Sequence, residues 1–227
     1  MDFCIYKMSG KRLKGWGSLL LLLAIPFSVG LTCSQPVQSS GDLFAERGLE
    51  AYDSGDYTRA IQQFKLAIDA GMTTHDLAEI YTMMGTAFDR LDQFDEALAA
   101  HKRAVELDPE SFRAWNNLGI AYFYLGQLNE AESSQKRAIN LKPDYALAYA
   151  SLGAVYVSRN EPDAAMQVLA EAIRLDETIA TAHANLALAY ALAGQFDAAE
   201  ASLQRAIGLG YENGAVVQQQ INDLKSQ

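Results

Sequence analysis

Cysteine is nearly absent from this sequence, and its two copies, Cys4 and Cys33, both lie within the first 33 residues. No disulfide can therefore cross-link the rest of the chain, whatever the redox state of its compartment. The rest of the chain does not need one, because a chain of 227 residues that is 50% hydrophobic can bury a sufficient core.

Histidine is also scarce, and the pattern of residues that usually builds an active site is missing. The three histidines, His75, His101 and His183, are far apart, and none belongs to a His-x-x-x-His or Cys-x-x-Cys spacing. The sequence contains no Gly-x-Ser-x-Gly elbow, Walker-type phosphate loop or dinucleotide fingerprint. We therefore expect no catalytic residues, no metal site and no cofactor.

Basic residues are outnumbered, with 18 Lys and Arg against 28 Asp and Glu. Residues 1–32 hold four of the basic and one of the acidic residues, so the remainder carries 14 basic and 27 acidic side chains, a net charge of about −13. Nucleic-acid binding depends on Lys and Arg that neutralise phosphates. The composition thus argues against a nucleic-acid partner and leaves membrane attachment to the N-terminus alone.

Small residues recur at a fixed interval along most of the chain. Gly48, Gly85, Gly119, Gly153 and Ala187 stand 37, 34, 34 and 34 positions apart. Further columns keep the same step, and in the third copy they are Trp115, Leu118, Tyr122, Ala131, Ala138 and Pro143. A period between 20 and 50 residues predicts a solenoid, in which each repeat packs on its neighbours.

Each copy contains two helical patterns. Apolar residues spaced by 3, 4 and 7 positions fall on one stripe of a helix, and this occurs twice per copy. Between the two stripes lie short turns that begin at Gly55, Asp92, Gly126, Asn160 and Gly194. We expect the Gly and Ala columns to let the two backbones of a hairpin approach closely, and the aromatic column, which includes His183, to fill the space between hairpins.

This pattern resembles the tetratricopeptide repeat (TPR) over about residues 41–213. The resemblance implies an all-α, right-handed superhelical solenoid of about five helical hairpins. We expect the repeats at residues 41–74, 78–111, 112–145, 146–179 and 180–213. Three additional residues around His75 lengthen the joint between copies one and two, and Pro162 opens the second helix of copy four.

The repeat pattern ends after Asn213. In residues 214–227, Val217, Ile221 and Leu224 share one stripe and polar residues occupy the other positions. Because the last repeat of a solenoid exposes an apolar face, this segment is predicted to be a capping helix.

Residues 1–32 have the layout of a signal peptide or a membrane anchor. Four basic residues precede an uncharged, leucine-rich run over residues 16–31, which is typical of an export signal. As a helix the run would extend about 24 Å, less than the roughly 30 Å hydrocarbon core of a bilayer. A buried helix of the repeat domain conflicts with the cluster of positive charge. Residues 33–40 are expected to be a short linker.

The segment from Gly30 to Cys33 resembles a bacterial lipoprotein signal, in which the cysteine thiol is acylated and becomes the new N-terminus. That family prefers Leu three residues before the cysteine and Gly or Ala directly before it, whereas this chain has Gly30 and Thr32. Three alternatives stay open: lipidation of Cys33, an uncleaved anchor, and secretion after Gly30. All three place the repeats outside the cytoplasm, in the periplasm or cell envelope.

The TPR resemblance implies that the first helix of each pair lines a concave groove that binds a peptide or helix. The positions expected to bind a partner are Leu49, Tyr52, Thr86, Asn116, Ile120, Phe123, Ala154, Val157 and Leu188, and the wider set adds Thr82, Asp89, Ala150, Ala184 and Ala191. The alternative for Ile120, Phe123 and Val157 is packing against neighbouring helices.

The groove positions are largely apolar. Family members that clamp a C-terminal carboxylate use Lys, Arg and Asn at these positions, and only Asn116 matches. We therefore expect capture of an apolar or amphipathic segment of a protein partner, with Asn116 bonding its backbone. The expected function is a non-enzymatic adaptor of the bacterial cell envelope. A regulatory subunit of an envelope hydrolase and a self-associating structural module are the alternatives.

Overall fold

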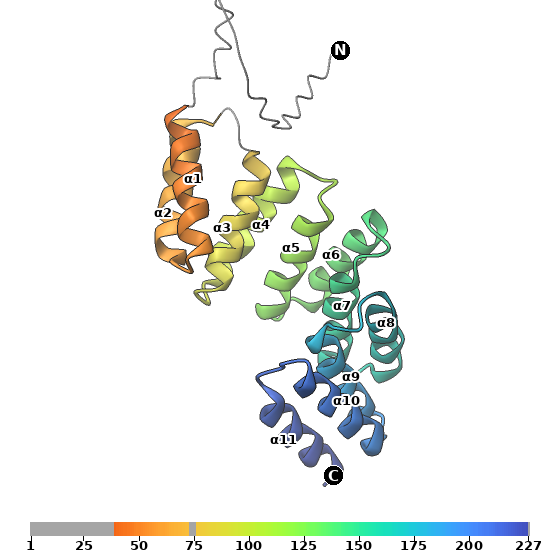
Figure 1. Ribbon diagram of the computed structural model, residues 1–227. Coiled ribbons are helices and arrows are strands. Elements are labelled where there is room, and N and C mark those ends of the chain that lie inside the picture. Colours follow the sequence, from red (N-terminus) through yellow and green to blue (C-terminus); the bar gives the residue numbers. More distant parts are fainter. Residues whose placement is uncertain (1–38, 73–75, 227) are drawn as a thin grey trace, which may run out of the picture. The chain divides into compact units, whose positions relative to one another are not determined.

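The computed structural model describes residues 39–72 and 76–226, all within one compact unit spanning residues 38–227. Every regular element among these residues is an α-helix (Figure 1). The helices are α1 (Ser40–Asp53), α2 (Tyr57–Ala70), α3 (Leu77–Asp89), α4 (Phe94–Leu107), α5 (Phe112–Tyr124), α6 (Leu128–Leu141), α7 (Ala146–Ser158), α8 (Pro162–Leu175), α9 (Ala180–Leu192), α10 (Phe196–Gly208) and α11 (Gly214–Lys225).

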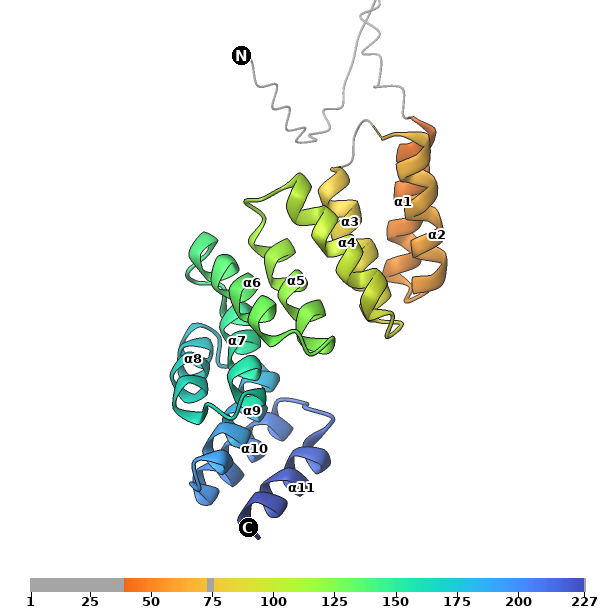
Figure 2. The ribbon, with the colours of Figure 1, turned by 180° about the vertical axis from the view of Figure 1, so that it is seen from behind.

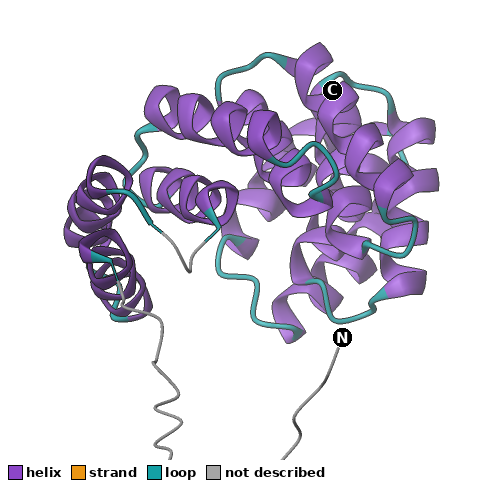
Figure 3. Ribbon diagram, turned by 90° about the horizontal axis from the view of Figure 1, so that it is seen from above, coloured by secondary structure: helices purple, strands orange, loops and turns teal. Residues whose placement is uncertain are grey.

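Consecutive helices pair as hairpins, and consecutive hairpins pack on one another. The pairs are α1 with α2, α3 with α4, α5 with α6, α7 with α8, and α9 with α10, and the second helix of each pair also contacts the first helix of the next. The pairs follow one another in chain order in both views (Figures 1 and 2). Viewed along another direction, the helices are joined by short loops (Figure 3). The all-α superhelical solenoid predicted from the sequence is thus confirmed.

The turn inside each hairpin contains one residue with a positive φ angle. These residues are Gly55 (80°), Asp92 (57°), Gly126 (72°), Asn160 (58°) and Gly194 (74°), and they keep the 34-residue step from Asp92 onward. Gly adopts this left-handed conformation without strain, and Asp and Asn tolerate it better than other residues. The turn sequences therefore follow from one backbone conformation.

The column of small residues marks where the two helices of a hairpin approach most closely. A Cβ atom at Gly48 would lie 2.5 Å from the Phe64 ring, and one at Gly153 would lie 2.4 Å from Leu169. In copy three, a Cβ at Gly119 would lie 2.5 Å from Gln135 Nε2. Each glycine thus faces the residue sixteen positions later, which is buried in the interior of its hairpin.

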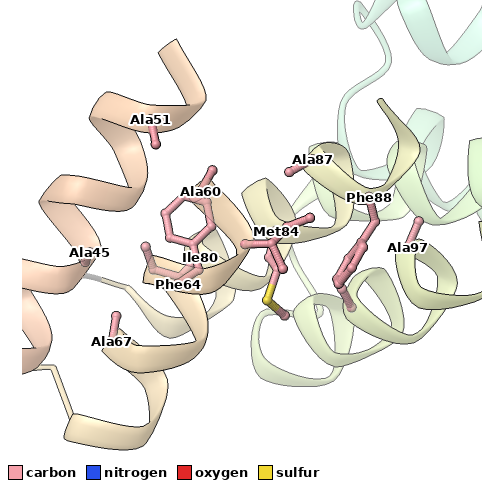
Figure 4. Close-up of a cluster of buried hydrophobic side chains, with 12 residues drawn as sticks. Ala45, Ala51, Ala60, Phe64, Ala67, Ile80, Met84, Ala87, Phe88 and Ala97 are labelled. Carbon is pink, nitrogen blue, oxygen red and sulfur yellow. The ribbon is translucent and has the colours of Figure 1, made fainter. Parts of the chain in front are cut away.

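The core consists of many small side chains and a few large ones. In the first two hairpins, Phe64 lies among alanines from α1 and α2, while Ile80, Met84 and Phe88 continue the packing into α3 (Figure 4). Phe64 is fully buried, as are five alanines of α1 to α4: Ala45, Ala60, Ala67, Ala87 and Ala97. Because alanine lets helices approach closely and large residues fill the remaining gaps, each hairpin buries a continuous core against the next.

The aromatic column forms the same hydrogen bond in three successive copies. Trp115 Nε1 donates to the carbonyl of Pro109 (2.9 Å), and the Tyr149 hydroxyl donates to the carbonyl of Pro143 (3.1 Å). His183 Nε2 lies 3.1 Å from the carbonyl of Glu177, also six residues earlier. Each bond ties the start of a first helix to the loop that precedes it, so His183 occupies a structural position.

The last helix covers the end of the stack. α11 packs against α9 and α10, and Val217 and Ile221 are buried there while Leu224 is half-buried. Cys33, the signal-like segment and His75 lie outside the described residues. Among the helices described, none has the length and apolar character needed to cross a bilayer.

Candidate functional site: a groove along the first helices

Two adjoining cavities lie along the first helices of copies three to five. The larger has a volume of about 470 Å³ and is lined by Phe123, Ala154, Val157, Ser158, Asn185, Leu188, Leu192, Gln220, Asp223 and Leu224. The smaller has a volume of about 280 Å³ and is lined by Asn116, Ile120, Phe123, Tyr124, Gln135, Leu147, Ala150, Ser151, Ala154, Thr181 and Asn185. They share Phe123, Ala154 and Asn185, and together we call them the groove.

Most of the positions expected from the sequence meet in this groove. Asn116, Ile120, Phe123 and Ala154 line the smaller cavity, and Val157 and Leu188 join Phe123 and Ala154 in the larger one. They come from α5, α7 and α9, the first helices of three successive pairs. Ile120, Phe123 and Val157 are each half-buried, so they pack against neighbours and still present surface to the groove.

The remaining expected positions lie elsewhere. Leu49 and Tyr52 pack against the core of the first two hairpins, where the Tyr52 ring contacts Tyr57 edge-on at 5.5 Å. Burial raises the pKa of the Tyr52 hydroxyl above its ordinary value. The Thr86 hydroxyl donates to the carbonyl of Thr82 at 3.0 Å, which restrains it against its own helix. None of the three lines either cavity.

Asp89, which belongs to the wider set of positions expected to face the groove, contacts His101 instead. Its Oδ2 lies 3.0 Å from Nε2 of His101, whose side chain is fully buried. Ala184 and Ala191 are almost completely buried and contribute packing instead of groove surface. His101 occupies the column that holds Phe64 in copy one, and it is enclosed within its hairpin, away from both cavities.

Residues one position further along α5, α7 and α9 also line the groove, although the repeat pattern did not predict them. Tyr124, Ser151, Ser158, Asn185 and Leu192 each follow a position that was expected to face the groove. A groove that wraps around a helix takes in a stripe wider than one residue per turn. Tyr124 and Leu147 both line the smaller cavity, and their side chains are large, apolar and exposed (57% and 46%).

The capping helix also belongs to the site. Gln220, Asp223 and Leu224 of α11 form one wall of the larger cavity. The sequence predicted a cap for the apolar end of the stack, and the structure shows that the same helix closes the groove. Its polar face therefore contributes the one charged side chain, Asp223, found in the lining of either cavity.

An aromatic cluster supports Phe123 in its groove position. The rings of Phe123 and Tyr124 meet edge-on at 5.9 Å, and Tyr124 stacks on Phe94 of α4 with ring centroids 4.7 Å apart. Such pairs stabilise by about 0.5 to 1.5 kcal/mol beyond the area they bury. The cluster connects the groove to the hairpin of copy two through Phe94.

The chemistry of the groove is that of a binding surface. Its walls are aliphatic and aromatic side chains with a few amides and hydroxyls, and residues 39–72 and 76–226 contain no group of three or more His, Cys, Asp or Glu that could hold a metal ion. Sites that bind ligands by shape combine apolar walls with a few convergent polar groups. The lining of the two cavities has this composition.

Comparison with known proteins agrees with the repeat pattern. Models described as tetratricopeptide repeat match residues 110–178 and 150–213, and one described as TPR repeat matches residues 85–126, so together they span more than half of the chain. A chloroplastic TPR domain-containing protein of Arabidopsis thaliana, PYG7, is 42% identical over 43 residues, which is 19% of this chain and 14% of that protein.

Solved structures share the fold over most of their length. The crystal structure of MamA protein is 26% identical with a TM-score of 0.62, over 77% of this chain and 94% of that one. A thermophilic TPR protein of Thermus thermophilus is 23% identical with a TM-score of 0.64, over 83% of this chain and 100% of that one. With its repeat columns, paired helices and these matches, the chain belongs to the tetratricopeptide repeat family.

Proposed function

We propose that this chain is a non-enzymatic adaptor that captures an apolar or amphipathic segment of a partner protein in the groove. TPR proteins generally mediate protein–protein interactions, and solenoids offer extended concave surfaces for this purpose. The observation that carries the proposal is the contiguous apolar lining from Ile120 through Phe123 and Val157 to Leu188.

The shape of the groove favours a helical or extended segment over a folded domain. The two cavities lie side by side and share Phe123, so a segment with apolar side chains one or two helical turns apart fills both. Phe123 stands between them and contacts anchors on either side. Buried aromatic residues at the centre of an interface usually dominate its affinity.

We place this adaptor in the bacterial cell envelope, tethered through its N-terminus. The support is the signal-like layout of residues 1–32 and the lipoprotein-like segment ending at Cys33. The acidic character of the chain after residue 32 leaves no electrostatic attraction to anionic lipid, so the tether is the only proposed attachment.

The test is co-isolation from detergent-solubilised envelope with Phe123→Ala against wild type. Leu66→Ala is the matched control, because Leu66 is 43% exposed on α2 and lies outside both cavities. We expect Phe123→Ala to weaken capture by about 2 kcal/mol, roughly thirtyfold in affinity, and Leu66→Ala to leave it unchanged. Equal capture by all three proteins rules the groove out as the binding surface.

Self-association is the second candidate, because two apolar residues are exposed at the C-terminal end of the stack. Val216 of α11 is 59% exposed and Ile207 of α10 is 44% exposed. Pairing of two copies through this end would bury both. Light scattering over a concentration series decides between a monomeric adaptor and this alternative, since only the latter gains mass with concentration.

A further inference from the structure

The start of α5 carries a cluster of aromatic and basic side chains. Lys142 Nζ lies 4.9 Å from the centroid of the Phe112 ring, and the guanidinium carbon of Arg113 lies 5.1 Å from it. The Tyr145 ring meets the Phe112 ring edge-on, with centroids 4.8 Å apart. We call these four residues the Phe112 cluster. It joins the first turn of α5 to the loop between α6 and α7.

Three positions of this cluster depart from the repeat pattern. The position of Phe112 holds a small residue in the other four copies: Gly41, Ala78, Ala146 and Ala180. The position of Arg113 is acidic in copies one and two: Asp42 and Glu79. The position of Lys142 is acidic in copies two and four: Asp108 and Asp176. Because no other copy has a basic residue at either position, both positive charges are particular to copy three.

Helix stability does not explain Arg113. It is the second residue of α5, and the positive end of the helix dipole disfavours a cation in the first turn. In α1 and α3 the same position holds Asp42 and Glu79, which this dipole favours. The Arg113 side chain is exposed, so burial in the core does not explain it either.

Both cations lack a carboxylate partner. Neither Arg113 nor Lys142 forms an ion pair within residues 39–72 and 76–226. Glu110, which is close in sequence, pairs with Arg137 at 2.9 Å instead. Arg113 is exposed and Lys142 is half-buried, so a binding partner can reach both. Their charges are at most about 10 Å apart, and they repel each other until a counter-charge binds.

We infer that the Phe112 cluster is a docking surface for an acidic segment of a partner protein, with one carboxylate on Arg113 and a second on Lys142. Side chains two residues apart in an extended segment lie on one face, about 7 Å from each other. This spacing fits the two cations, which form charge-assisted hydrogen bonds with carboxylates.

The charge of the whole chain selects a short acidic segment over a larger polyanion. The chain has a net charge of −10, so a nucleic acid or an anionic membrane would meet repulsion beyond the cluster. A segment with two acidic residues confines its charge to the two cations. The inference goes beyond the proposed capture in the groove and does not depend on it.

Matched variants remove one charge each. Arg113→Gln and Lys142→Gln act on the cluster, whereas Arg205→Gln removes an exposed charge from α10, outside the cluster, and controls for net charge. Because the other copies have no base at positions 113 and 142, the variants are expected to fold. Thermal unfolding verifies this, and the midpoint of Arg113→Gln should equal or exceed that of wild type.

The experiment titrates the purified full chain with the peptide acetyl-Gly-Glu-Gly-Glu-Gly-amide and with its Gln counterpart, followed by chemical-shift changes. Wild type is expected to bind the Glu peptide about tenfold more tightly than the Gln peptide. Each cluster variant should weaken binding of the Glu peptide about threefold, and the double variant about tenfold. Raising the salt concentration from about 0.05 to 0.3 M should also weaken it several-fold, whereas Arg205→Gln should have little effect.

Three results overturn the inference. The first is equal affinity for the Glu and Gln peptides, and the second is a loss in Arg205→Gln as large as in the double variant. The third is binding of inorganic phosphate as tight as that of the Glu peptide and lost in the double variant, which would assign the cluster to a free anion.

The groove and the cluster are tested separately. Phe123→Ala should leave binding of the Glu peptide unchanged, and the double variant should leave capture in the groove unchanged. If Phe123→Ala abolishes capture while the Glu preference is absent, the proposed function stands and the docking surface fails. If the Glu preference is present while Phe123→Ala leaves capture unchanged, the reverse holds.

Discussion

His183 Nε2 lies 3.1 Å from the backbone carbonyl of Glu177, in the geometry that Tyr149 uses toward Pro143 one repeat earlier. A carbonyl oxygen only accepts hydrogen bonds, so Nε2 carries the proton and donates it. The histidine therefore acts as a substitute for the aromatic donor of the repeat.

We predict that the donor at position 183, and not the imidazole itself, matters for stability. His183→Phe removes the donor and should lower the free energy of unfolding by about 1 kcal/mol. His183→Tyr should keep the bond, as Tyr149 does, and remain close to wild type. Urea unfolding monitored by circular dichroism measures both. Equal stability of the Phe and Tyr variants would show that the bond contributes nothing.

Three glycines should respond differently to the same substitution. Gly153→Ala places a methyl group 2.4 Å from Leu169, so overpacking should cost about 1 to 3 kcal/mol. Gly126→Ala meets no neighbour within 4 Å but forces alanine to a φ of 72°, which should cost about 1 kcal/mol. Gly208→Ala has open space at the end of α10 and should be neutral or stabilising by up to about 1 kcal/mol.

Unfolding curves of the three alanine variants test this order. Gly126→Asn is a further control, since Asn160 adopts a φ of 58° at the equivalent turn of copy four. It should recover most of the stability lost in Gly126→Ala. A Gly153→Ala protein as stable as wild type would contradict the close approach of α7 and α8.

An ion-pair network links copies three and four and gives the protein a pH-dependent contribution to stability. Hydrogen bonds lower the pKa of the Glu132 carboxyl group from 4.5 to about 2, although burial acts in the opposite direction. The bond from Lys136 has the largest effect, and Arg159 and Tyr156 donate the others. Arg159 also donates to Asn129 Oδ1 and to the carbonyl of Leu128. It therefore fixes the start of α6 to the end of α7.

We predict that Glu132→Gln loses this contribution only where the carboxylate is charged. Since the folded pKa lies below the unfolded one, the stabilisation is complete above about pH 4.5 and disappears as the pH falls toward about 2. The variant should be less stable by about 1 to 2 kcal/mol at pH 7, because partial exposure screens the pair, and equal to wild type near pH 2.

Glu171→Gln is the control for this prediction. Glu171 pairs with Arg174 three residues away on the exposed face of α8, and it should change stability little at any pH. Urea unfolding at a series of pH values measures both variants. A Glu132→Gln deficit that is the same at pH 7 and near pH 2 would assign the loss to packing.

The repeat columns were sufficient to predict the fold, because each column corresponds to one physical requirement that recurs. The turn residues Gly55, Asp92 and Asn160 share a left-handed φ, and Trp115, Tyr149 and His183 share one hydrogen bond. The three-dimensional structure was needed to interpret a column whose residues differ in chemical character. Gln135 stands in line with Phe64 and Leu169, and only the structure shows that this buried amide donates to the carbonyl of Asn116 and forms part of the lining of the smaller cavity.

Groove positions were predicted in all five copies, and most of those of copies three to five line the two cavities, together with residues that were not predicted. About one groove position per helical turn was predicted, whereas the lining also includes Leu147, Asn185 and Leu224. The contribution of α11 depends on how the cap is seated against α9. A repeat pattern contains no information on that contact, since α11 is the one helix among residues 39–72 and 76–226 without a repeat equivalent.

The proposed lipid anchor at Cys33 is tested by Cys33→Ser, which replaces the side-chain sulfur atom with oxygen. If Cys33 is acylated, Cys33→Ser should accumulate as an unprocessed precursor of higher mass and lose lipid-dependent retention, because stable anchoring needs more than one acyl chain. Mass spectrometry of the wild-type protein from the membrane fraction should find a chain that begins at a lipid-modified Cys33. An unmodified full-length chain would instead assign the tether to an uncleaved anchor.

The last prediction concerns the forces that hold the partner. Asp223 is the one charged side chain in the lining of the groove, so most of the affinity should come from apolar area. Raising the salt concentration from about 0.1 to 0.5 M screens exposed charges strongly and should change the dissociation constant less than about threefold. Asp223→Asn should have a similarly small effect, whereas Leu188→Ala, which removes an apolar side chain from the lining of the larger cavity, should weaken binding by about tenfold. Affinity that collapses at moderate salt, together with an unchanged Leu188→Ala isotherm, would move the interaction from the groove to the acidic outer surface.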